Sequence, residues 1–393
     1  MSHLTRRHAL QALAALATTA ALPGVRAESA TPGARPAPAA NARRRAEKMP
    51  LVHITDLYHP PQDPDDHLDL LTIAALPEFE VRGVVLDATR RFLLNRPEGW
   101  DIPRDPGYVP VAQLGYLTGR AIPVGLGPLD PLGHPGDTAR DRPRPEQAGI
   151  ELLLEVLERS SRPVTISVVG SARVLAAAYN REPRLLRERT RVVLLNAGAT
   201  GGVKREWNVG LDPAAYVAVW RSGLPIDWYP CATDRSAFDP ADERGTFWKA
   251  PQAQIFRDLP ESLRAWLCYA FTGNGRGDII RALAETGRGD AWNEILAGER
   301  NLWATVSLVM AAGRVLARTD GGWRFLSPAE AAGRESWPFQ LDPIRATVDD
   351  DAHVGWAAVS SATPVRLFAR RPGADYGIAM AEAFNALLRS FPA

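Results

Sequence analysis

The chain has 393 residues, of which 46% are hydrophobic and 23% are charged, and its formal net charge is +1. This composition is typical of a soluble globular protein that buries one large core or two smaller ones. The arginines are scattered along the chain, which argues against a nucleic acid as partner. The two cysteines, Cys231 and Cys268, exclude a dense disulfide framework and leave open one bridge or two separate thiols.

The N-terminal residues are similar to a twin-arginine export signal. Arg6 and Arg7 precede a moderately apolar stretch at 9–22, and Val25-Arg26-Ala27 offers a small-residue cleavage site. We therefore expect residues 1–27 to direct the protein to the periplasm or the extracellular space. The stretch is too short and too weakly apolar to predict a stable membrane span. Residues 28–49, rich in Ala, Pro and Arg, predict a disordered linker before a folded domain at 50–393.

Strand-like and helix-like segments alternate over the first part of this domain. Apolar runs predict strands at 51–54, 81–86, 122–126, 164–169, 191–195 and 225–229, with helices between them, for example at 67–76, 110–120 and 146–159. Such alternation predicts an α/β fold with an open, mostly parallel sheet flanked by helices. Residues 250–315 predict a mainly helical C-terminal half, followed by a mixed region with a strand at 364–369 and a final amphipathic helix.

Four aspartates lie in the loop between the first predicted strand and the first predicted helix: Asp56, Asp63, Asp65 and Asp66. Ligands of open α/β sheets bind outside the carboxyl ends of the strands, where this loop is expected. Crowded carboxylates repel one another unless a cation or protons neutralise them, and oxygen ligands select a hard ion such as Ca²⁺ or Mg²⁺. Helix capping would explain Asp65 and Asp66 alone. An EF-hand is excluded, because its glycine and glutamate positions hold Leu68 and Ala74.

These acids, together with several later segments, resemble the inosine-uridine nucleoside hydrolase family. Asp56 and the Asp65-Asp66 pair answer to the N-terminal aspartate signature of that family, although Thr55 replaces its first acid and the loop is longer. Further matches lie at 121–129, 165–176 and 191–198 and in Glu206-Trp207-Asn208, which is followed by Asp212-Pro213. The resemblance covers roughly residues 50–235 in order and implies a single Rossmann-like domain.

The resemblance implies a calcium-dependent hydrolase that cleaves the N-glycosidic bond of a ribonucleoside or related small sugar. Its metal ligands would be Asp56, Asp66 and the main-chain carbonyl of Arg173, while Asp63 is either an extra ligand or a polar loop residue. Asp65 would be the general base that takes a proton from a calcium-bound water. Glu206 and Asn208 would bind ribose hydroxyls. The structural alternatives are a surface acid at Glu206 and a turn residue at Asn208, and Asp212 is expected to cap a helix.

Two departures from the family pattern bear on the substrate. The region at 299–305 lacks the aspartate of the family's fourth ligand, so Asn301 or a water would complete the metal shell, and Asp87-Ala88-Thr89 replaces a Gly-Asn. His353 is a candidate for protonating the leaving group, and His59 and His67 flank the acids. Two alternatives therefore stay open: hydrolysis of another glycoside or polyol-type substrate on the same metal site, and a non-catalytic calcium-stabilised binding protein. Assembly into a homo-oligomer is also left open.

Overall fold

The computed structural model describes residues 47–95, 103–202, 205–272, 278–285 and 289–391. The described residues belong to one compact unit, and its first strand, β1, is Met49–Thr55. The predicted export signal lies outside the described residues, as does the predicted linker except for residues 47–49. Within the described ranges, no helix is both long and apolar enough to cross a membrane.

A nine-stranded sheet runs through the described part of this unit, in the order β13-β12-β14-β6-β5-β4-β1-β2-β3. All neighbours from β3 to β14 are parallel, and β12 and β13 extend the other edge with antiparallel pairing. Beside β1, its strands are β2 (Phe79–Leu86), β3 (Val124–Leu126), β4 (Val164–Val169), β5 (Thr190–Leu195), β6 (Ile226–Trp228), β12 (Phe339–Val348), β13 (Val354–Ala358) and β14 (Val365–Arg370). The prediction of a mostly parallel α/β sheet is thereby confirmed.

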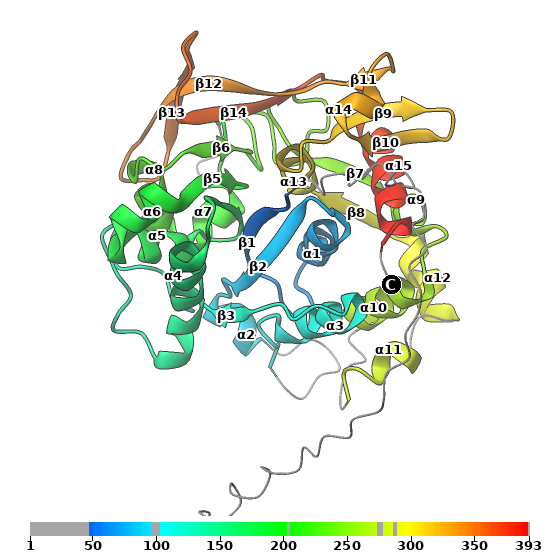
Figure 1. The fold of residues 1–393 in the computed structure, drawn as a ribbon, viewed down its shortest axis with the longest axis horizontal. Helices are drawn as coiled ribbons and strands as arrows, with labels where there is room; N and C mark the ends of the chain where they lie inside the picture. The colour runs from blue at the N-terminus through cyan, green and yellow to red at the C-terminus, as the bar shows by residue number, and fades with distance from the viewer. Residues whose placement is uncertain (1–46, 96–102, 203–204, 273–277, 286–288, 392–393) are drawn as a thin grey trace, which may run out of the picture. The chain divides into compact units, whose positions relative to one another are not determined.

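Helices cover both faces of the sheet, because its central strands bury alternate residues on opposite sides. In β1, Leu51 belongs to one hydrophobic cluster, whereas Val52 and Ile54 belong to a second. The first cluster includes residues of α1 (Asp65–Ala75), α10 (Glu261–Thr272), α13 (Thr305–Ala311) and α15 (Tyr376–Arg389). The second includes residues of α4 (Ala148–Arg159), α5 (Arg173–Arg181), α6 (Pro183–Arg189) and α8 (Pro213–Arg221). Figure 1 shows these two groups of helices on opposite sides of β1.

The C-terminal half is helical only in part. Its helices at 250–315 include α9 (Gln252–Phe256), α11 (Ala282–Glu285) and α12 (Asp290–Ala297), and a two-stranded sheet of β7 (Trp248–Pro251) and β8 (Glu299–Leu302) accompanies them. A three-stranded sheet follows, made of β9 (Val315–Thr319), β10 (Gly322–Leu326) and β11 (Ser336–Trp337). The other helices are α2 (Arg90–Leu94), α3 (Tyr108–Thr118), the 3-10 helix η1 (Arg144–Gln147), α7 (Trp207–Leu211) and α14 (Pro328–Ala331).

The strand order reverses next to β1. From β1 the chain adds β2 and β3 on one side, and from β4 it adds β5 and β6 on the other. Loops that leave the carboxyl ends of β1 and β4 therefore diverge and open a crevice between them, which is where open α/β sheets bind their ligands. Thr55 at the end of β1 pairs with Val169 at the end of β4, so the residues that follow these two strands start side by side.

Candidate functional site

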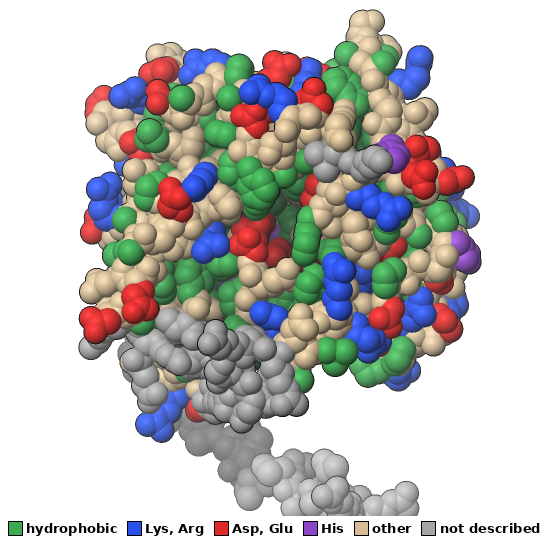
Figure 2. All heavy atoms as spheres, turned by 180° about the vertical axis from the view of Figure 1, so that it is seen from behind, with side chains coloured by type: hydrophobic (Ala, Val, Ile, Leu, Met, Phe, Trp, Pro, Cys, Tyr) green, Lys and Arg blue, Asp and Glu red, His purple; other side chains and the backbone are tan. Residues whose placement is uncertain are grey.

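A pocket of about 490 Å³ opens at this reversal point, within the range of roughly 300–1,000 Å³ typical of small-molecule sites. Figure 2 shows a hollow near the middle of one face of the molecule, where acidic side chains lie among hydrophobic ones. Five aspartates line the pocket: Asp56, Asp63, Asp65, Asp66 and Asp69. The structure thus brings together all four aspartates of the predicted loop and adds Asp69 from the second turn of α1.

The first turn of α1 presents Asp65 and Asp66 to the pocket, and neither residue is the helix cap. The N-cap position is Pro64, which makes no side-chain capping hydrogen bond. Asp66 instead accepts a hydrogen bond of 2.8 Å from the hydroxyl of Thr55 at the end of β1. This bond ties the helix to the strand that carries Asp56, and a capping role alone therefore does not account for the pair.

Burial makes these carboxylates costly to ionise. It raises the pKa of Asp56 to about 7, and the neighbouring charges of Asp87 and Glu206 add to the effect. Burial is also the main cause that raises the pKa values of Asp65 and Asp66 well above the ordinary range, and nearby aspartates raise them further. Burial raises the pKa of Asp69 to about 8. The pocket thus concentrates negative charge that needs protons or a cation for compensation.

The carboxylates are not drawn into a preformed metal cage. No group of three or more His, Cys, Asp or Glu side chains in the described ranges is placed so that it could hold a metal ion. Their chemistry still fits a hard divalent cation. The donors are oxygens, Asp56 and Asp69 are buried, and one oxygen of Asp69, Oδ1, has no hydrogen-bond partner among the described residues. The oxygen donors of these residues are the type that a hard cation prefers, but their side chains would have to close around the ion.

Asp63 forms an ion pair with Arg300, which links the acidic loop to β8. Its Oδ1 lies 2.9 Å from an Nη of Arg300 in β8, and the same guanidinium donates two hydrogen bonds of 3.2 and 3.0 Å to Gln252. The longer acidic loop is thereby fastened to the strand that leads to Trp303 and Ala304, which also line the pocket. Of the two roles left open for Asp63, this contact favours the loop residue over the metal ligand.

Asp63→Asn should therefore have small effects. The carboxylate of Asp63 is about half exposed, with 51% of its side-chain surface accessible, so loss of the ion pair should lower the free energy of unfolding by about 1 kcal/mol or less in a urea titration. Calcium affinity, measured by calorimetry, should stay within roughly threefold of the wild-type value. Asp66→Asn serves as the positive control for lost affinity. A tenfold loss in Asp63→Asn would make Asp63 a ligand.

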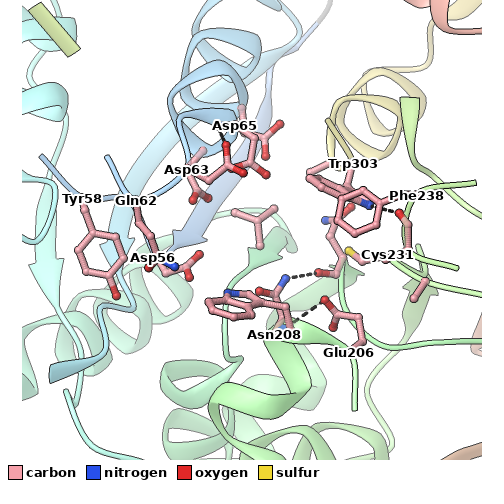
Figure 3. Close-up of a pocket in the computed structure, with 18 of the residues that line it drawn as sticks. Asp56, Tyr58, Gln62, Asp63, Asp65, Glu206, Asn208, Cys231, Phe238 and Trp303 are labelled. Atoms are coloured by element: carbon pink, nitrogen blue, oxygen red, sulfur yellow. Dashed lines mark hydrogen bonds between the residues drawn. The ribbon is translucent and has the colours of Figure 1, made fainter. Parts of the chain in front are cut away.

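Glu206 and Asn208 lie across the pocket from the acids (Figure 3). Glu206 is 7% exposed, which excludes the surface-acid alternative. It is the N-cap of α7, and its carboxylate accepts bonds from the backbone N–H groups of Gly198, Asn208 and Val209 at 2.8, 3.1 and 3.3 Å. The side chain of Asn208 donates to the carbonyl of Asn196, 3.0 Å away. Both predicted sugar ligands thus have fixed positions facing the pocket.

Aromatic side chains form two further walls of the pocket. Phe238 and Trp303 lie side by side in Figure 3, with ring centroids 5.6 Å apart, and Phe247 packs behind both at 5.6 and 5.3 Å. On another side, Trp207 stacks on Phe92 with centroids 5.8 Å apart. Phe238 and Trp207 are 59% and 54% exposed. Large aromatic surfaces that stay open to solvent at a pocket are suited to stacking on a planar ligand.

Arg173, whose main-chain carbonyl is expected from the resemblance to bind the metal, is not among the residues that line this pocket. Its fully buried side chain forms an ion pair with Asp212, with 3.0 Å between Nε and Oδ2, and donates to the carbonyl of Pro128. Asp212 also accepts from the backbone of Ala215 as the N-cap of α8, which confirms its expected capping role. The main-chain position at the pocket is Val169, the last residue of β4.

The predicted histidines lie outside the pocket. His59 is buried in a stack on Tyr269 with centroids 4.7 Å apart, and His67 packs against Trp266. His353 lines a second, neighbouring cavity instead, where its ring lies 3.2 Å from Asp349. None of the three is therefore placed to protonate a leaving group in the acid-lined pocket.

The two departures from the family pattern also have structural explanations. Residues 299–302 form β8, in which Asn301 pairs with Lys249 of β7, and Asn301 is not among the residues that line the pocket. Asp87 is fully buried behind Asp56 and accepts a hydrogen bond of 2.7 Å from Ser171. Neither residue faces the pocket, so no further carboxylate ligand is found among the described residues of these segments.

Several pocket residues escaped the sequence reasoning. Asp69 follows Asp65 by four positions, a spacing that places both on one face of a helix, but its apolar neighbours hid it. Asn196 directly follows β5, as Asp56 follows β1, and this recurrence at a strand end is a usable signal. Phe238 and Trp303 had no such signal. Cys231 also lines the pocket, and it is not disulfide-bonded to Cys268, which settles the two thiols as separate.

The sequence of this chain is similar to those of ribonucleoside hydrolases. The chain is 29% identical over 198 residues to the pyrimidine-specific ribonucleoside hydrolase RihA of Salmonella agona, a match that covers 45% of this chain and 58% of that protein. RihA of Enterobacter sp. is 28% identical over 197 residues with the same coverage. The chain thus spans less than two thirds of the length of these curated relatives. No protein-family model matches it.

Solved structures of nucleoside hydrolases are similar over most of their length. The purine-preferring ribonucleoside hydrolase of Gardnerella vaginalis gives a TM-score of 0.49 at 13% identity, covering 86% of this chain and 99% of its own. The inosine-uridine preferring nucleoside hydrolase of Bacillus anthracis gives 0.46 at 12% identity, covering 87% and 99%.

Proposed function

We propose that this protein is a calcium-dependent ribonucleoside hydrolase, which cleaves the bond between a ribose and a nucleobase with water. The observation that carries the proposal is that one pocket holds buried carboxylates on one side and the fixed pair Glu206 and Asn208 on the other. The sequence similarity to ribonucleoside hydrolases over 198 residues supports it.

Asp56 and Asp66 would hold the calcium ion, and the main-chain oxygen of Val169 replaces that of Arg173 as the third protein donor. Two buried carboxylates with raised pKa values gain most from a divalent cation, because the cation removes both their mutual repulsion and the desolvation cost of their charge. When bound, calcium would orient the attacking water and lower its pKa. The carboxylates would have to move inward to surround the ion.

The protein's own groups would perform the remaining chemistry. Asp65 takes a proton from the attacking water as the water adds to the anomeric carbon and the nucleobase leaves. Glu206 and Asn208 hold the sugar hydroxyls. Because both are fixed by backbone contacts, they can keep the ribose in the flattened, oxocarbenium-like geometry through which glycosyl bonds break. No side chain is assigned as the acid that protonates the leaving base.

The aromatic walls favour a nucleoside over an all-polar polyol as the substrate. Phe238 and Trp303, which meet edge to face, both line the pocket, and so does Trp207. A nucleobase has a planar surface that would cover such rings, while a polyol would leave them exposed to water. Stacking also accepts purines and pyrimidines alike, since every base has a π-face.

A screen of purine and pyrimidine nucleosides for release of the free base, with and without a chelator, tests the proposal directly. We expect release from at least one nucleoside, dependent on calcium and restored by its readdition. Release that is insensitive to the chelator would overturn the metal-dependent mechanism, and absence of release from every nucleoside would favour the binding-protein alternative.

Phe238→Ala should weaken nucleoside binding selectively. Loss of one stacking ring is worth about 1–3 kcal/mol per base, or roughly 5- to 150-fold in affinity. Calorimetry with a nucleoside and with ribose would show a greater loss for the nucleoside. Tyr116→Ala is the matched control, because Tyr116 is an aromatic residue of similar exposure that does not line the pocket. Equal losses for nucleoside and ribose would mean that Phe238 does not contact the base.

We also propose export through the twin-arginine route, on the basis of Arg6-Arg7 and the apolar stretch that follows. Arg6→Lys combined with Arg7→Lys should retain the protein inside the cell, as measured by fractionation. Export of this double variant at the wild-type level would contradict the proposal.

A further inference from the structure

A second cavity of about 320 Å³ adjoins the pocket, and Arg205 and Glu206 line both. Its other walls include Gly198, Tyr216 and His353. Because Glu206 stands at the boundary, the part of a sugar that faces Glu206 from the pocket points toward this second cavity. A substituent on that part of the sugar would have room to enter it.

Arg205 is an exposed cation at the boundary of the two cavities. It makes no ion pair and no hydrogen bond with any other residue that the structure describes. A guanidinium carries five N–H donors in a planar fork that matches the oxygens of a phosphate or carboxylate. At the junction of two cavities, such a group is placed to contact a ligand that extends from one cavity into the other.

Tyr216 lines the second cavity, and its hydroxyl is buried. Tyr216 is 2% exposed, and its hydroxyl makes no hydrogen bond with a described residue. The hydroxyl lies directly against Gly198, whose φ of +86° and lack of a side chain permit the approach, since a Cβ there would overlap it. A buried donor left unpaired costs free energy that a ligand oxygen would recover.

The acidic groups around the cavity already have partners within the protein. Glu206 accepts three backbone N–H groups, which compensate its charge locally. His353 contacts Asp349, and both are about half exposed. A neutral hydroxyl on the ligand would satisfy Tyr216 but leave Arg205 without an opposite charge. An anion satisfies both.

We infer that the second cavity is a subsite for a phosphate group carried on the sugar of the substrate, so that the preferred substrate is a nucleoside monophosphate. The inference rests on the proposed function, because that function places the sugar between the acids and Glu206. Arg205 pairs with the phosphate, and the Tyr216 hydroxyl donates to one of its oxygens. The products of hydrolysis would be a free base and a ribose phosphate.

Binding of ribose and of ribose 5-phosphate to the full protein with calcium, measured by calorimetry, tests the inference. The wild-type protein should bind ribose 5-phosphate at least roughly tenfold more tightly than ribose, as one charge-assisted contact provides. Arg205→Gln should reduce this ratio to about threefold or less, and Tyr216→Phe should reduce it in part. The ratio is the readout, because it cancels general damage to the pocket.

Arg91→Gln is the matched control. Arg91 is an exposed arginine that packs over Phe92 and Trp207 near the pocket but lines neither cavity, so its replacement should keep the ratio. If wild-type protein binds ribose and ribose 5-phosphate equally, the phosphate subsite is overturned while the proposed function stands. A preference that survives Arg205→Gln overturns it as well, since the phosphate then sits elsewhere. If neither sugar binds, the proposed function itself fails.

Discussion

Replacement of Asp65 by asparagine is expected to remove turnover while the protein still binds calcium and substrate. Asp65 lines the pocket from the first turn of α1, and its carboxylate is the group proposed to accept the proton of the attacking water. An amide cannot accept that proton, so kcat should fall by roughly 10²- to 10⁴-fold. Single-turnover measurement of base release gives the rate, and calorimetry gives the affinities.

Asp63→Asn is the matched control for this experiment. Asp63 comes from the same loop and lines the same pocket, but its carboxylate is held by Arg300. Its kcat should stay within about tenfold of the wild-type value. If Asp65→Asn retains a comparable kcat, another group is the base. If calcium binding is lost together with turnover, Asp65 is a ligand.

Removal of calcium is the second change that we expect to have a large effect on turnover. A chelator should lower turnover by roughly 10²-fold or more, and added calcium should restore it. Asp66→Asn should abolish the calcium-dependent rise in melting temperature and the turnover together. The physical reason is that Asp66 loses the charge that attracts the cation, while an amide can still accept the bond from Thr55.

In the presence of chelator, Asp66→Asn should not lower the melting temperature and is expected to keep or raise it. Without calcium, Asp66 lies part-buried near Asp56 and Asp65, and its pKa is raised first by this burial and then by the neighbouring charges. Asp66→Asn should then melt at the wild-type temperature or above it, because one buried like charge is gone. A clearly lower melting temperature in chelator would show that the carboxylate is needed for folding rather than for the metal.

The acidic side of the site could be predicted because its residues are close in sequence. Asp56 and Asp66 flank a single loop, and the strand and helix on either side have strong apolar patterns. The parallel sheet could be predicted from the same apolar patterns. The order of its strands could not be predicted, because the pairing between β1 and β4 joins residues more than a hundred positions apart, such as Thr55 and Val169.

The remaining walls depend on such distant contacts. Trp303 directly follows β8 and contacts Phe238, which precedes the partner strand β7, and nothing in the local sequence of either residue signals this contact. The choice of the carbonyl donor depends on a contact of the same kind. A motif fixes a loop to within a few residues, whereas the pairing of Thr55 with Val169 decides which residue reaches the pocket. Arg173 lies four residues farther on, at the start of α5, where its side chain forms an ion pair with Asp212.

Cys231 gives the pocket a chemical reporter of its own. Its thiol lines the pocket wall, and burial together with the nearby acids raises its pKa well above the ordinary value, so alkylating reagents should modify it slowly. A bound ligand would cover it further. The rate of Cys231 modification, followed by mass spectrometry with the Cys268 peptide as internal reference, can therefore rank compounds by occupancy before any reaction is known.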